Sequence, residues 1–73
     1  MNLEELVDRF YVDVSRADGH HVNGEAEVIR EGRDIVALLV LTSGRSPNIT
    51  TPVLVPWHAV TAVSVIEEKL HYD

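Results

Sequence analysis

The 73-residue sequence predicts a mainly β fold with one N-terminal helix, in which five short strands curl into a strongly bent small barrel. Three observations support this fold class. The apolar residues repeat first with a helical period and then with the period of a strand. Turn and loop signals separate the strand-like runs. Five strands in so short a chain cannot lie flat and keep a core, so we expect them to curl.

The N-terminal helix is predicted over residues 2–10. Asn2 can cap it, and Glu5 three residues later completes a pattern that resembles a capping box. The helix has only about two turns, so it needs packing against the rest of the chain to persist. Its apolar residues have the i, i+3, i+4, i+7 spacing of one helix face: Leu3, Leu6, Val7 and Phe10.

The first two strands are predicted from alternating apolar and polar residues. One such run covers residues 10–15 and a second covers residues 21–28, with Asp18-Gly19 as the turn signal between them. Gly24 lies inside the second run. A glycine within a strand marks a sharp bend or the close approach of another backbone, so we expect the second strand to bend there.

The third predicted strand, Ile35–Leu41, is apolar on both faces. It is expected to be the central strand, with one face on the barrel interior and the other under the helix. The barrel spans residues 10–66 of a single domain, 1–73. Within it we predict a turn over residues 31–34, a polar loop over 42–51, a fourth strand over 53–55, a tight corner over 56–59 and a fifth strand over 60–66. Residues 67–73 are expected to form a tail that frays.

Composition limits the functions that the chain can perform. The formal net charge is -6, the opposite of the basic footprint of a general nucleic-acid binder. The sequence contains no cysteine, which excludes disulfides and thiolate metal sites. It contains neither the roughly 20 apolar residues of a membrane span nor a basic secretory start, so we expect a cytoplasmic protein without a membrane partner.

Three short segments resemble one known family. In "DGHHVNG", Gly19 and Gly24 are separated by four residues and surround the start of the second strand. Ile35–Leu41 follows as an apolar third strand, and in "VPWHAVTAV" a histidine precedes the fifth strand. These segments resemble the Sm-like (Hfq-like) family, over roughly residues 3–67. The resemblance implies a five-stranded, SH3-like small barrel that forms a homo-oligomeric ring and binds single-stranded RNA.

Matched residue by residue, the resemblance places His58 at the family's histidine. Trp57 stands where the family has a basic residue, and Arg33-Asp34 stand at a corner where the family has an aromatic one. These departures remove much of what would hold a uridine-rich strand. A second resemblance is to PRC-barrel domains, which dock proteins or cofactors, and it rests on "GRDIVALLVL" and "LVPWHAV".

No other pattern in the sequence indicates chemistry. His20 and His21 are adjacent, so on a strand they point to opposite faces, and a surface turn explains them better than a metal site. Glu25 and Glu27 share one strand face, as is typical of a solvated surface or a subunit rim. No cofactor is expected, and no catalytic or metal-ligating residue is predicted. Arg30, Arg33 and Arg45 are more simply solvated loop residues than a basic patch.

The Sm-like resemblance makes four residues the candidates for ligand binding: His58, Trp57, Arg33 and Asp34. The predicted structural residues are Gly19, Gly24 and Pro56. Trp57 is expected to cover the barrel mouth, with its indole N–H bonded to a carbonyl. Two functions remain open. One is a non-enzymatic ring that binds single-stranded RNA or a nucleotide-like ligand at subunit junctions. The other is a protein-docking or structural assembly module without nucleic-acid binding.

Overall fold

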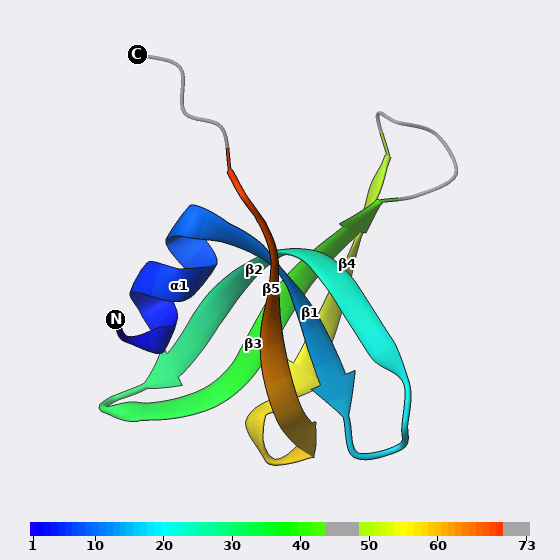
Figure 1. The fold of residues 1–73 in the computed structure, drawn as a ribbon. Helices are drawn as coiled ribbons and strands as arrows, with labels where there is room; N and C mark the ends of the chain where they lie inside the picture. The colour runs from blue at the N-terminus through cyan, green and yellow to red at the C-terminus, as the bar shows by residue number, and fades with distance from the viewer. Residues whose placement is uncertain (44–48, 70–73) are drawn as a thin grey trace.

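The computed structural model describes residues 1–43 and 49–69 of the chain. A short helix is followed by four strands, a single turn of 3-10 helix and a fifth strand (Figure 1). In chain order these elements are α1 (Leu3–Arg9), β1 (Phe10–Arg16), β2 (His21–Glu31), β3 (Asp34–Ser43), β4 (Thr50–Pro56), η1 (Trp57–Ala59) and β5 (Val60–Glu68).

The five strands form one antiparallel sheet in the order β4-β3-β2-β1-β5. β1 pairs with both β2 and β5, so the first strand lies beside the last. β4 and β5 are the two edges, and no ladder joins them in the described part of the chain. The mainly β fold with one helix is therefore confirmed, whereas the sheet is open and its predicted closure into a barrel is not observed.

The central strand, β2, changes partner at Gly24. Its residues up to Gly24 pair with β1, and those from Glu25 onward pair with β3. Gly24 has a φ of 146°, which side chains with a Cβ rarely adopt, and a Cβ placed there would overlap the carbonyl oxygen of Leu41. The predicted bend with close backbone approach is therefore confirmed, and the strong curvature of β2 is visible in Figure 1.

The hydrophobic core is one cluster that both halves of the bent sheet and the helix build together. Valine supplies most of it, which suits strands because β-branched side chains pack well on a pleated surface. Leu38 on β3 has the largest of the fully buried side chains. The buried members of the cluster are Val7, Val12, Val14, Val22, Ala26, Leu38, Val40 and Val55.

Helix α1 is capped as the sequence predicts. The N–H of Glu5 donates to the Asn2 Oδ1 at 2.9 Å, which satisfies one of the free donors of the first turn. Val7 is buried in the core, and the helix packs mainly against β2 and β1. It ends at Arg9 because Phe10 is extended and begins β1.

The predicted position of the third strand is wrong. β2, not β3, is central in the sheet, and α1 does not lie mainly over β3. The inner face of β3 is buried as expected, but its other face is only partly covered, and Leu41 is 37% exposed. The run Ile35–Leu41 therefore has one face in the core and one face that is partly exposed to solvent.

The predicted tail and loop boundaries are also partly wrong. β5 continues to Glu68, and Lys69 donates its N–H to the Arg9 carbonyl at 2.7 Å, so residues 67–69 do not fray. β3 and β4 pair within the predicted loop, where two threonines, Thr42 and Thr51, face each other. Residues 44–48, including the candidate Arg45, and residues 70–73 lie outside the described part.

Candidate functional site

The predicted ligand corner is a short turn that joins the two edge strands. β4 ends at Pro56, η1 follows, and β5 then begins. η1 lies against β3, and Ala17 donates its N–H to the Ala59 carbonyl at 2.8 Å. The tight corner predicted over residues 56–59 is therefore confirmed, and its backbone is held from two sides.

The two rings of this corner are accessible. Trp57 is 37% exposed and His58 is also exposed. Within the described chain, neither side chain makes a hydrogen bond or an ion pair, so the predicted indole-to-carbonyl bond is not observed there. An exposed indole beside an exposed imidazole offers a stacking surface and a polar group to a ligand.

The other two predicted ligand residues lie at the turn between β2 and β3. Gly32 has a φ of 62°, which a tight turn requires, and Arg33 follows it. The Arg33 carbonyl accepts a hydrogen bond from the Arg30 Nη1 at 2.8 Å, and the Arg33 side chain is exposed. Asp34 begins β3, the strand against which η1 lies. Both pairs of predicted residues therefore lie next to β3. Among the described residues, no hydrogen bond or ion pair joins the side chains of one pair to those of the other.

Ion pairs occupy most cations of the described chain. Arg33 makes no ion pair among the described residues, but every other arginine or lysine there has a carboxylate within 4.0 Å. Because phosphate contacts supply most of the affinity for nucleic acid, this surface offers few groups to a phosphate backbone. The four pairs are Arg9–Glu68, Arg16–Asp18, Arg30–Glu4 and Lys69–Glu25.

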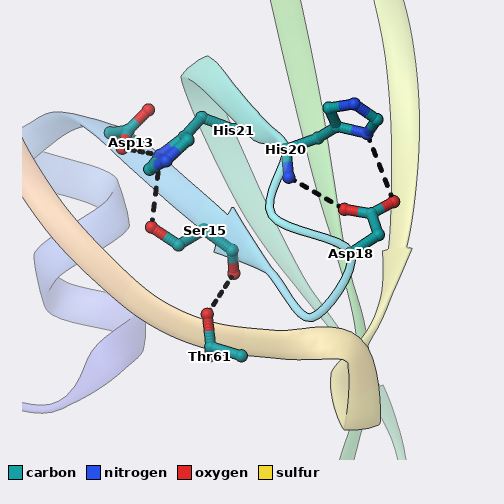
Figure 2. Close-up of polar contacts among 6 residues, drawn as sticks. All are labelled: Asp13, Ser15, Asp18, His20, His21 and Thr61. Atoms are coloured by element: carbon teal, nitrogen blue, oxygen red, sulfur yellow. Dashed lines mark hydrogen bonds and ion pairs between the residues drawn. The ribbon is translucent and has the colours of Figure 1, made fainter.

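The adjacent histidines contact different aspartates at the β1–β2 hairpin, as Figure 2 shows. The Nδ1 of His20 lies 3.5 Å from the Asp18 Oδ2. The Nδ1 of His21 lies 2.9 Å from the Asp13 Oδ2. The histidines therefore belong to two separate clusters, and no group of three or more metal-ligating side chains exists among the described residues.

His21 also contacts a serine, which raises the question of a catalytic triad. The Ser15 Oγ lies 3.2 Å from the His21 Nδ1, the same nitrogen that contacts Asp13. A triad needs the carboxylate on one ring nitrogen and the serine on the other, so that the serine proton can move to the ring. A carboxylate only accepts, so this Nδ1 carries a hydrogen and cannot take the serine proton.

The cluster of Asp13, Ser15 and His21 is not apparent from the sequence alone. Its signal is the hairpin register: a turn at Asp18-Gly19 places Ser15 opposite His21, and Asp13 lies two residues farther on the same face. The contact between His21 and Asp13 is exposed and joins β2 to β1. Thr61 of β5 donates its hydroxyl to the Ser15 carbonyl at 3.1 Å. The cluster therefore serves the local structure.

The pKa of the Asp18 carboxyl is lowered from its ordinary value. The backbone N–H of His20 donates to the Asp18 Oδ1 at 3.0 Å, and this bond is the largest cause of its lowered pKa. The positive charges of Arg16 and His20 lower the pKa further, and desolvation opposes them. The turn therefore favours the ionised form of the Asp18 carboxyl, which accepts the His20 N–H.

The acidic pair on β2 lies beside a partly open apolar surface. Glu25 faces Leu41 and Glu27 faces Leu39 across the β2–β3 ladder. These residues line a cavity of about 260 Å³, together with Asp8 and Lys69. The alternating pattern of β2 indicates that the two glutamates share a face, but the leucines opposite them follow only from the register of β2 against β3.

Comparison with known proteins gives no identification. No family model, no curated protein and no solved structure matches this chain. Over the residues that the structure describes, no helix has the length and apolar character needed to cross a membrane.

Proposed function

We propose that this chain is a non-enzymatic module that self-associates through the free edge of β5 and docks other proteins. The observation that carries this proposal is the exposed apolar edge, where Ile66 is 52% exposed and Val65 is 48% exposed. Edge strands in native proteins are normally paired or blunted by charge or proline. Residues 60–66 of β5 contain neither, and the charges of this strand are confined to Glu67 and Glu68 at its end.

The other edge is partly blunted. β4 contains Pro52 and Pro56, and proline cannot donate to a ladder, so it is tolerated where the N–H would point to solvent. Leu54 lies two residues from each proline, so its N–H points to the same outer side of β4. Between the two prolines, this N–H is the backbone donor that remains on the outer side. β5 is thus the better edge for pairing with a second copy, and two copies of β5 would form a symmetric dimer.

The sequence resemblances support a module of this kind. An Sm-like, strongly bent small barrel is the finer fold that we propose, and that family forms rings of identical subunits. The PRC-barrel resemblance points to protein docking. Burial also favours assembly, because a lone chain near this size buries only about 60% of its unfolded surface.

Self-association is tested by light scattering at micromolar concentration. We expect a mass of at least twice the 8.2 kDa of one chain. Ile66→Lys places a charge on the β5 edge and should reduce the mass to that of a monomer. Leu54→Lys, at a residue that is 61% exposed on the other edge, is the matched control.

The two variants separate the possible pairings. If only Ile66→Lys dissociates the assembly, β5 pairs with β5. If both variants dissociate it, β5 pairs with β4 of the next copy and a larger ring is formed. A wild-type monomer, or an unchanged mass for Ile66→Lys in a folded protein, would contradict the proposal.

Binding of single-stranded RNA or a nucleotide is the second candidate, and the exposed Trp57–His58 corner favours it. Stacking of a base on the indole would contribute about 1–3 kcal/mol, while the scarcity of unpaired cations makes the salt dependence shallow. In an anisotropy titration with labelled oligo-U and oligo-A at low salt, Trp57→Ala and His58→Ala should each weaken binding without changing the oligomer. No binding at roughly 100 µM protein would remove this candidate.

A further inference from the structure

One face of the sheet changes from acidic to apolar across three neighbouring strands. Residues directly opposite each other in an antiparallel ladder point to the same face. The ladders therefore form two parallel rows, each of which begins with a glutamate on β2, continues with a leucine on β3 and ends with an apolar residue on β4. The rows are Glu25–Leu41–Pro52 and Glu27–Leu39–Leu54.

Two carboxylates of this face have no paired cation among the described residues. Lys69 pairs with Glu25, at 3.3 Å between the Nζ and the Oε1. Within the described chain, neither Asp8 nor Glu27 makes an ion pair. The cavity thus has three acidic side chains and one lysine in its lining, so two negative charges are left over beside the leucines.

The Lys69 ammonium group holds the cavity lining in place. Its Nζ also donates to the Val7 carbonyl at 2.9 Å and lies 5.8 Å from the centre of the Tyr11 ring. The Lys69 side chain is only 13% exposed. These contacts tie the end of α1 to β2 and β5, so the acidic end of the face is already formed before any partner binds.

We propose that this face, which we call the acid–leucine face (Asp8, Glu25, Glu27, Leu39, Leu41 and Leu54), docks a partner-protein segment that presents an arginine or lysine beside an aliphatic residue. The inference rests on the proposed docking function and names its partner class. The cation pairs with Asp8 and Glu27, and its methylene stem lies over Leu39 and Leu41. The neighbouring aliphatic side chain packs toward Leu54, which is exposed.

Charge argues for a partner protein and against a second copy as the occupant. Among the arginines and lysines that a second copy offers in its described residues, all but Arg33 are already paired. An inorganic cation would use the carboxylates alone and leave the leucines exposed. A basic and aliphatic segment matches both parts of the face, and it suits a chain with a net charge of -6.

The test uses a capped peptide, acetyl-Gly-Leu-Arg-Leu-Arg-Leu-Gly-amide, added to the isotope-labelled protein at concentrations up to about 1 mM. We expect amide resonances of residues 25–27 and 39–41 to shift during the titration. The control peptide carries citrulline in place of arginine, which keeps the shape and removes the charge. It should bind about fivefold more weakly, which is what one or two partly exposed ion pairs contribute.

A double variant, Asp8→Asn with Glu27→Gln, should weaken the arginine peptide by about fivefold as well. Its matched control is Glu5→Gln with Glu31→Gln, which removes the same charge from the same two elements outside the cavity lining. Equal binding of the two peptides, equal loss in both double variants, shifts confined to β5, or no binding would each overturn the proposal.

The mass of each variant separates this proposal from the proposed assembly. Light scattering should give the same mass for the Asp8→Asn, Glu27→Gln variant as for the wild type, because the β5 edge is unchanged. If this variant alone dissociates, the face binds a second copy, and the partner-peptide inference is wrong. A monomeric wild type that still binds the arginine peptide at this face would leave the docking inference standing without the assembly.

Discussion

At the scale of single residues, Gly24 carries the bend of the sheet. Gly24→Ala would force a Cβ against the Leu41 carbonyl in a backbone conformation that alanine rarely adopts. We expect a loss of at least about 2 kcal/mol in the free energy of unfolding, from strain and overlap together. The measurement is urea denaturation followed by circular dichroism.

Gly19→Ala is the control for this prediction. Gly19 also has a positive φ, of 87°, but apart from its chain neighbours no described residue has an atom within 4 Å of a Cβ placed there. It should cost only about 1 kcal/mol, from strain alone. Equal losses for the two variants would mean that the close approach to β3 contributes nothing.

Asp18 makes stability depend on pH at the β1–β2 turn. Its pKa is lowered in the folded protein from the ordinary 3.8, so its charge stabilises the fold above that value. This contribution is lost as the pH falls below 3.8 and through the lower folded pKa. Asp18→Asn keeps an acceptor for the His20 N–H and removes the charge.

The expected result for Asp18→Asn is lower stability than the wild type at pH 7, with a difference that shrinks as the pH falls from about 4 to about 2. Urea midpoints at several pH values measure it. Glu31→Gln, which removes another exposed carboxylate, is the control for the loss of one negative charge and should cost less stability at pH 7 than Asp18→Asn. A constant difference over this range would refute the role assigned to the Asp18 charge.

At the scale of elements, Lys69 joins the end of β5 to the end of α1. Lys69→Met keeps most of the apolar stem and removes the ammonium group that contacts the Val7 carbonyl and Glu25. We expect a loss of about 1–2 kcal/mol in the free energy of unfolding, because the bonds are charge-assisted and the side chain is mostly buried. Arg9→Gln breaks an exposed pair with Glu68 and should cost less than about 0.5 kcal/mol.

The contrast between these two variants can be measured by urea denaturation and by amide hydrogen exchange in α1. Lys69→Met should speed exchange at the C-terminal end of α1, because the helix loses its link to β5. Unchanged exchange and stability in Lys69→Met would show that the helix is held by its apolar face alone.

At the scale of the whole molecule, the sequence predicted what depends on local pattern. The period of the apolar residues indicated one helix and five strands, and Gly24 indicated the bend, because each of these features is written in a few adjacent positions. The order of the strands is not local. Ile35–Leu41 looked central because it is apolar on both faces, yet β2 holds that place in the sheet.

The candidate sites divide in the same way. Trp57 and His58 stand in the corner that the sequence indicated, because Pro56 ends β4 locally. The acid–leucine face depends on which residue of β3 lies opposite Glu27, and a shift of one residue would move every leucine to the other face. The composition of this face depends on the register of β2 against β3, which cannot be predicted from a single sequence.

The pairing of β1 with β5 also has a consequence for how the chain is made. During synthesis, β1 and β2 can form their hairpin early, but the other side of β1 stays bare until β5 has been made. Contacts between distant parts of a chain form slowly because loop closure must come first. The nascent chain therefore keeps one edge of β1 open until residues 60–68 have been made, and β5 then covers that edge.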